Sequence, residues 1–167
     1  VGRINLGTEG QMLVGAVAGY ATAAVSGNPW LGLVGGALAG AALSAVYAWL
    51  TVAADANQFA SGLAVWMLGF GLSAYFGSQF VGVRIEGFEA NLGGLTPTVL
   101  LALLLVPLTA VWLYGTRDGL RWRAVGESEA SARALGIVPW RVVVCGIVVG
   151  GLFSGLGGAA LSIDTTR

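Results

Sequence analysis

Four long stretches without a charged side chain constrain this sequence more than any other feature. They run from Gly10 to Ala54, from Ala56 to Val83, from Ala90 to Thr116 and from Val142 to Ile163. An α-helix rises about 1.5 Å per residue, so roughly 20 apolar residues cross the ~30 Å hydrocarbon layer of a bilayer. Each stretch can hold one such helix, and the first can hold two. The sequence therefore predicts an all-α, polytopic membrane protein.

The composition agrees with a membrane location and excludes several functional classes. Of the 167 residues, 56% are hydrophobic and only 10% are charged, which is too few for a water-covered surface. All eight basic residues are Arg and the net charge is zero, so no basic face is available for nucleic acid. With no His, one Cys and neither a nucleophile elbow nor a phosphate-binding glycine loop, the sequence predicts no metal, no cofactor and no catalysis.

Five membrane spans fit these stretches. Turn signals divide the first stretch at Ser26 to Pro29, and Asp55 and Asn57 mark a second short turn. We expect spans over residues 11–26, 30–52, 58–81, 96–116 and 142–163. A single transmembrane domain over residues 1–167 is the simplest organisation. Because the sequence starts at Val1 and stops soon after its last apolar run, we interpret it as a fragment.

The polar connector at residues 117–141 fixes the predicted orientation. It holds five of the eight basic residues: Arg117, Arg121, Arg123, Arg133 and Arg141. Cytoplasmic loops collect Arg and Lys, so we expect this loop in the cytoplasm. Alternation then places the N-terminal end and the turn near Asp55 inside, and the loop from Arg84 to Leu95 outside.

Glycine pairs at four-residue spacing occur within the predicted spans: Gly15 with Gly19, Gly36 with Gly40, Gly146 with Gly150, and Gly151 with Gly155. Small residues at this spacing let membrane helices approach closely. We expect most of these pairs to serve packing alone. The single Cys145 lies in an apolar run and is expected to be a buried filler.

Two polar clusters at predicted span starts are candidates for a solute path. Asn5, Thr8, Glu9 and Gln11 open the first span, and a carboxylate at this position is costly unless it is solvated or paired. Either Thr8 caps the helix and Glu9 suits its N-terminus, or the helix is broken there and lines a path. Asn57, Gln58 and Ser61 open the third span and either contact solute or cap the turn and join helices. The candidate path residues are Asn5, Glu9, Asn57, Gln58 and Ser61.

A short amphipathic helix is predicted within the connector, from Glu127 to Leu135. This segment is rich in helix formers and is closed by Gly136 and then Pro139. Glu129 and Arg133 are four residues apart in the favourable order for an ion pair. The helix either binds a cytoplasmic partner or is only a solvated loop element.

The connector string TRDGLRWRAVGESEASARALGI, residues 116–137, resembles the permease subunits of ABC importers, in the group of branched-chain amino acid, ribose-type sugar and nucleoside permeases. The family pattern is T-x-x-G-x-x-x-R-A-x-G-E-N-P-x-A-A-x-x-x-G-I. The matching residues are Thr116, Gly119, Arg123, Ala124, Gly126, Glu127, Ala132, Gly136 and Ile137. Ser128 and Glu129 replace the usual Asn-Pro and Ser131 replaces an Ala, although Ser128 is itself a suitable N-cap.

This resemblance implies a function and a set of partners. The segment is then the coupling helix that docks on a cytoplasmic ATPase, with the roles carried by Arg123, Gly126, Glu127, Ala132, Arg133, Gly136 and Ile137. The strings INLGTEGQMLVGA and ANQFASGLAVWMLGFGLSAYFG look most like the nucleoside, basic-membrane-lipoprotein-associated branch. The implied partners are two ABC ATPase subunits, a second permease subunit and an extracytoplasmic solute-binding lipoprotein, in the inner membrane of a bacterial cell. A sugar or branched-chain amino acid permease, an ion-coupled transporter or channel, and a non-transporting scaffold remain the alternatives.

Overall fold

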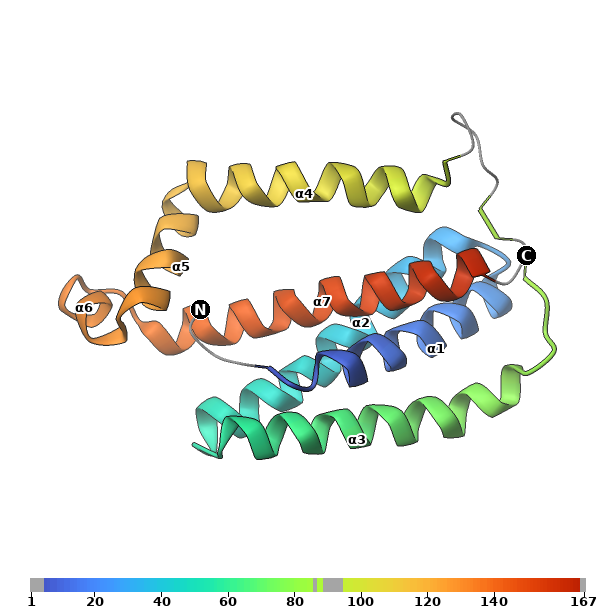
Figure 1. The fold of residues 1–167 in the computed structure, drawn as a ribbon, viewed down its shortest axis with the longest axis horizontal. Coiled ribbons are helices and arrows are strands. Elements are labelled where there is room, and N and C mark those ends of the chain that lie inside the picture. Colours follow the sequence, from blue (N-terminus) through green and yellow to red (C-terminus); the bar gives the residue numbers. More distant parts are fainter. Residues whose placement is uncertain (1–4, 86, 89–94, 166–167) are drawn as a thin grey trace. The chain divides into compact units, whose positions relative to one another are not determined.

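The computed structural model describes residues 5–85, 87–88 and 95–165, and every regular element within these ranges is helical (Figure 1). This confirms the predicted all-α class. The elements in chain order are α1 (Thr8–Ser26), α2 (Pro29–Ala48), the π-helical turn η1 (Trp49–Ala53), α3 (Gln58–Gly77), the 3₁₀ turn η2 (Ser78–Phe80), α4 (Pro97–Gly115), α5 (Arg117–Glu127), α6 (Glu129–Ala134) and α7 (Pro139–Thr165).

Four helical segments within the described residues are long and apolar enough to cross a membrane. They are Pro29–Ala53, Gln58–Phe80, Pro97–Gly115 and Pro139–Thr165, and they correspond to the second to fifth predicted spans. The helix α1 occupies the first predicted span but begins at Thr8 rather than Gln11, and it is not among the four. Glu9 and Gln11 in its first turns lower its hydropathy.

The helix boundaries follow from local chemistry. Gly27 ends α1 with φ +65°, a left-handed conformation that glycine adopts without steric cost. The side chain of Asn28 then accepts a hydrogen bond from the Trp30 N–H at 2.9 Å, and Pro29 occupies the first position of α2. The predicted turn between the first two spans is therefore confirmed.

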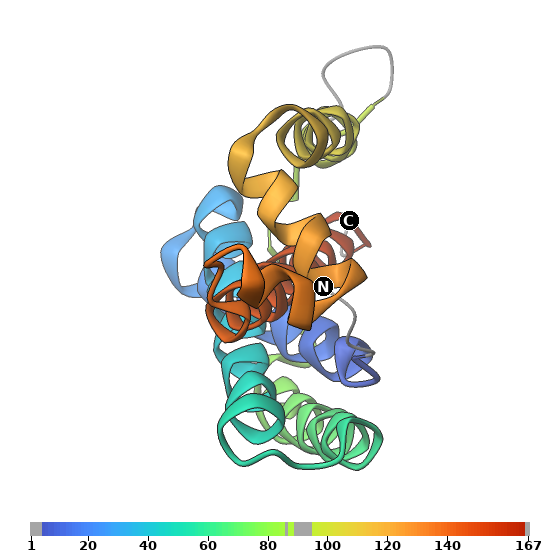
Figure 2. The ribbon, with the colours of Figure 1, turned by 90° about the vertical axis from the view of Figure 1, so that its left-hand side faces the viewer.

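The chain folds into two compact units. One contains α4, α5, α6 and the first part of α7, up to Gly146. The other contains α1, α2, α3 and the part of α7 from Ile147 onward. In the second unit α1 contacts both α2 and α3, and Figure 2 shows these helices nearly end-on.

Glycine brings the backbones of α1, α2 and α7 into direct contact. A Cβ atom on Gly15 would collide with the backbone of Gly155, and one on Gly155 would collide with the carbonyl of Gly36 and lie 2.9 Å from the Gly40 Cα. A side chain at any of these positions would force the helices apart. The close-packing prediction is therefore confirmed for these four residues.

The same contacts give the helix directions in this unit. Gly7 lies beside Val65 and Val17 lies beside Gly77, so α1 and α3 run parallel. Gly19 lies against Gly32 and the earlier Gly15 lies against the later Gly36, so α2 runs opposite to α1. Successive spans therefore alternate in direction over α1 to α3, as a chain that crosses the membrane repeatedly must do.

Two sequence expectations about α7 are wrong. A Cβ on Gly150 would meet no atom within 4 Å, so the Gly146–Gly150 pair does not pack through Gly150. Cys145 is exposed rather than buried. Both residues lie on sides of α7 that face away from the glycine contacts, because only the side with Gly151 and Gly155 meets α2.

Candidate functional site

The connector between α4 and α7 consists of two helices where the sequence predicted one over residues 127–135. The helix α5 ends at Glu127 and α6 begins at Glu129, with Ser128 between them in an extended conformation (φ −158°, ψ 113°). The Ser128 hydroxyl oxygen accepts a hydrogen bond from the Ser131 N–H at 3.2 Å. Ser128 is therefore an N-cap, as predicted, and the extended backbone of a cap separates the two helices.

The helix α5 was missed by the sequence analysis, although its start carries a recognisable signal. The Thr116 hydroxyl oxygen accepts a hydrogen bond from the Gly119 N–H at 3.1 Å and so caps α5. Asp118 in the first turn suits the helix N-terminus and pairs with Arg121 at 2.8 Å. A Thr cap followed by an acidic residue is a common helix start.

A glycine turn closes α6. Gly136 has φ +77°, its N–H donates to the Arg133 carbonyl at 3.0 Å, and the Ile137 N–H donates to the Ala132 carbonyl at 3.0 Å. This pair of bonds is a Schellman motif, which requires a left-handed residue at the position of Gly136. The predicted closure at Gly136 is confirmed, and Glu129 and Arg133 form the predicted ion pair at 3.3 Å.

The residues predicted to couple to an ATPase fall into two structural groups. Arg123, Gly126, Glu127, Arg133 and Gly136 are exposed. Ala132 is 1% exposed and Ile137 is half-buried, so these two hold the shape of the connector. Arg123 lies over the ring of Tyr114, 5.0 Å from its centroid, which ties the exposed face of α5 to the end of α4.

The polar cluster at the start of α1 forms a local network. Asn5 accepts a hydrogen bond from the Gly7 N–H at 2.9 Å and donates to Gln11 at 3.4 Å. One interpretation of the sequence made Thr8 the N-cap of α1, and this interpretation is wrong. The N-cap position is Gly7, which has no side chain to accept a hydrogen bond, and the Thr8 hydroxyl donates to the Asn5 carbonyl instead. Trp66 of α3 donates to the Glu9 carboxylate at 3.0 Å.

This start of α1 lies well along α3, not level with its end. A Cβ on Gly62 would lie 3.0 Å from the Leu6 backbone, and one on Gly10 would lie 2.8 Å from the Trp66 backbone. Trp66 is eight residues after the first residue of α3, or about 12 Å along the helix axis. Non-helical backbone at such a depth is tolerated in membranes only where it is buried in protein or lines a polar cavity. The non-helical residues 5–7 are therefore packed beside α3 and not beyond its end.

The second polar cluster is mainly structural in this conformation. The Asn57 side chain caps α3 by accepting from the N–H groups of Phe59 at 2.9 Å and Ala60 at 3.3 Å. Ser61 is 6% exposed. Of the five candidate path residues, Glu9 reaches α3 through Trp66 and Asn5 contacts Gln11, whereas Asn57 contacts its own helix. Gln58 lies in the first turn of α3 beside it.

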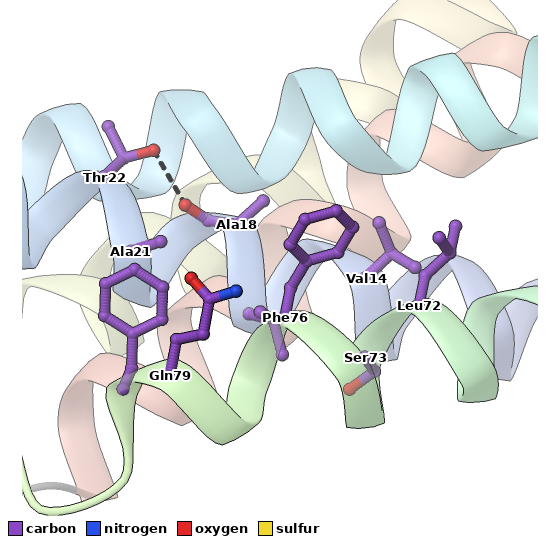
Figure 3. Close-up of a pocket in the computed structure, with 10 residues that line it drawn as sticks. Val14, Ala18, Ala21, Thr22, Leu72, Ser73, Phe76 and Gln79 are labelled. Carbon is purple, nitrogen blue, oxygen red and sulfur yellow. Dashed lines mark hydrogen bonds between the residues drawn. The ribbon is translucent and has the colours of Figure 1, made fainter.

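A separate cleft of about 510 Å³ lies between α1 and the last turns of α3 (Figure 3). Its lining is mostly apolar, and the Thr22 hydroxyl in it donates to the Ala18 carbonyl at 2.7 Å. A hydrophilic solute needs several converging polar groups, so we do not regard this cleft as the solute site. Its lining residues are Val14, Val17, Ala18, Ala21, Thr22, Leu72, Ser73, Phe76, Gln79 and Phe80.

The fold and the connector thus define a polytopic helical membrane protein with a capped two-helix loop. Over residues 1–167 the chain matches the family model described as branched-chain amino acid transport system, permease component. The chain belongs to this family, which confirms the family resemblance. Members of the family are transport components rather than enzymes, in agreement with the sequence analysis.

Three curated relatives cover nearly the whole chain. A putative glucose ABC transporter permease protein, TsgC13 of Haloferax volcanii, is 39% identical over 97% of this chain and 55% of its own length. The guanosine permease protein NupQ of Bacillus subtilis is 29% identical over 99% of this chain and 61% of its own length. The nucleoside permease protein NupC of Lactococcus lactis is 30% identical over 95% and 58%. The chain therefore spans somewhat more than half the length of these relatives, and no solved structure matches it.

Proposed function

We propose that this chain forms part of the permease subunit of an ABC importer, which moves a sugar or a nucleoside inward by alternating access. The observation that carries the proposal is the α5–α6 connector. Its two helices are fixed by side-chain caps at Thr116 and Ser128 and by the glycine turn at Gly136, so the loop is structured without any partner. A structured loop between two spans can transmit force, whereas a flexible loop would absorb it.

The exposed face of the connector is the proposed docking surface for the ATPase. Arg123, Glu127 and Arg133 present charge there, and Gly126 leaves the backbone accessible. In this proposal, separate ATPase subunits hydrolyse ATP. This chain contributes the connector that receives their movement and the spans that line the solute path. The proposed assembly also contains a second permease subunit and an extracytoplasmic solute-binding lipoprotein, in the inner membrane of the cell.

The names of the relatives support a solute that contains a sugar ring. The relatives are named for glucose, guanosine and nucleosides, and all of these solutes carry a hydroxylated sugar ring. We favour a nucleoside because the strings at residues 4–16 and 56–77 resemble that branch. The higher identity to the glucose permease supports a hexose as the second candidate.

Exchange of Glu127 tests the coupling role. We expect Glu127→Lys in the full-length permease to lower co-purification with the ATPase and ATP-dependent uptake at least tenfold. The new cation lies at the C-terminal end of α5, where the helix dipole favours it, so stability should not fall. Asp118→Asn is the control, since Asp118 is an exposed carboxylate on the same helix outside the proposed docking surface and its loss removes only an exposed ion pair.

Normal association and uptake in the Glu127→Lys variant would contradict the coupling role. Uptake that persists without any ATPase and follows an ion gradient would support an ion-coupled transporter instead. Uptake of radiolabelled guanosine and glucose, each competed by the other, separates the two candidate solutes.

A further inference from the structure

The side chain of Gln11 is fully buried, with 0% of its surface exposed, yet its Nε2 atom has no hydrogen-bond partner among the residues that the structure describes. Buried polar groups are nearly always satisfied in native proteins, so an unsatisfied amide requires an explanation. In a membrane the need is stronger, because lipid offers no hydrogen bonds.

The direction of this amide is set by its neighbours. The Gly7 N–H donates to the Oδ1 atom of Asn5, so the other end of the Asn5 amide is a donor. That donor meets the Oε1 atom of Gln11 at 3.4 Å. The remaining atom of Gln11 is therefore its NH₂ group, which seeks an oxygen acceptor.

The amide belongs to the interior of its unit. Gln11 precedes Gly15 by one helical turn and so shares its face, and Gly15 lies against Gly155 of α7. The first turn of α1 carries no side-chain cap, so its N–H groups add positive potential at the same depth. An uncapped helix start and an unpartnered amide together suit an oxygen-bearing ligand.

We propose that Gln11 contacts the transported solute and donates a hydrogen bond to a hydroxyl oxygen of its sugar ring, while Asn5 positions the amide. This inference rests on the proposed transport function and adds a residue to the path. A sugar hydroxyl is common to hexoses and nucleosides, so Gln11 recognises the class of solute and leaves the choice between them to other residues.

The test uses the full-length permease with its ATPase and its solute-binding lipoprotein in proteoliposomes, and the probes are radiolabelled guanosine and glucose. Gln11→Met keeps the length of the side chain and removes the amide. We expect it to raise the KM of the transported probe about tenfold, equivalent to about 1.4 kcal/mol. Gln79→Met is the matched control, because Gln79 is exposed and lies outside the proposed site; it should leave the KM unchanged.

Asn5→Ala is a second variant in case Gln11→Met does not fold. It removes the hydrogen bond that orients Gln11 and should raise the KM about threefold, which a role in packing alone does not predict. Unchanged KM values in both variants, with higher thermal stability of Gln11→Met, would show that the amide is only a packing residue and overturn the inference.

Direct binding separates this inference from the proposed function. Each probe is added to the purified full-length permease, and the shift of its melting temperature is measured in the wild type, Gln11→Met and Gln79→Met. A shift in the wild type and Gln79→Met that disappears in Gln11→Met supports the inference even if ATP-driven uptake fails. Equal shifts in all three proteins would overturn the inference and leave the proposed function intact.

Discussion

The helices α1 and α4 each contain 19 residues, but they differ in composition and in how much of their surface other helices cover. The helix α4 is rich in Leu and has a mean hydropathy of 2.1. Only 6% of its most apolar 18-residue stretch is buried within the chain. The helix α1 is rich in Gly and Ala, is opened by Glu9 and Gln11, and places Gly10, Gly15 and Gly19 against neighbouring backbones.

The difference shows that hydropathy and burial report separate properties. A high mean hydropathy shows that a helix can lie in lipid but does not say how much of it is buried: α7 has the same mean hydropathy as α4, 2.1, yet 33% of its most apolar stretch is buried. Glycine and polar residues mark a helix that neighbours surround, because small residues allow close approach and polar groups need protein partners. The helix α1, which is not apolar enough to be counted among the four candidate membrane spans, is therefore the helix that its neighbours α2, α3 and α7 surround.

The largest expected effect in this comparison comes from a side chain at the glycine contact. Gly155→Leu inserts four carbon atoms against the backbones of Gly36 and Gly40 and should lower the free energy of unfolding by more than ~3 kcal/mol. The measurement is unfolding of the purified protein in detergent micelles. Gly150→Leu is the matched control on the same helix, where a Cβ meets open space, and it should cost less than ~1 kcal/mol. Equal losses would mean that α7 does not pack through its Gly155 side.

Leucine truncation is expected to give a smaller contrast. Leu33 in α2 is 4% exposed and packs in the glycine-rich unit, so Leu33→Ala should lower the unfolding free energy by ~2–4 kcal/mol. Leu104 in α4 is 61% exposed, and Leu104→Ala should cost less than ~1 kcal/mol. Thermal unfolding of both variants in micelles measures the difference. A large loss from Leu104→Ala would show that α4 is packed against protein and not exposed to lipid.

The glycine turn of the connector extends the comparison to Gly136, where the left-handed backbone conformation, and not close packing, favours glycine. Gly136→Ala forces a Cβ into a left-handed conformation and should destabilise the connector by ~1–2 kcal/mol. Hydrogen exchange of the α6 amides, which should become faster, measures this local effect. Gly150→Ala replaces a helical glycine in open space and should be neutral or stabilising by up to ~1 kcal/mol. Unchanged exchange in α6 would mean that the turn contributes little to its order.

The smallest effect is expected from the exposed ion pair of α6. Arg133→Gln removes the contact with Glu129 and should change the unfolding free energy by only ~0.2–0.5 kcal/mol, an effect that weakens as salt concentration rises. If ATPase association nevertheless falls strongly in this variant, Arg133 acts at the docking surface and not in the fold. Unfolding and co-purification measured on the same preparation separate the two roles.

Much of the fold could be predicted because lipid imposes a simple pattern. Four apolar helices and the turn at Asn28 lie where the charge-free stretches and turn residues placed them. The connector was predicted less well, because its two helices are short and a single extended residue, Ser128, divides them. Of the candidate site, Asn5 and Glu9 were named from sequence, whereas Gln11 was noted only as a polar neighbour. Its burial appears only in the folded unit, where Gly15, one helical turn later on α1, meets Gly155 of α7, a segment far away in the chain.

The sequence by itself determined the helical class, the membrane location and the family, because hydropathy, turn chemistry and the connector motif are local properties. Tertiary structure alone decided which glycines form contacts, how far along α3 the start of α1 lies, and which polar side chain remains buried without a partner. These depend on how helices approach one another, and the same residue type, as Gly150 and Gly155 show, can face open space or a neighbouring backbone.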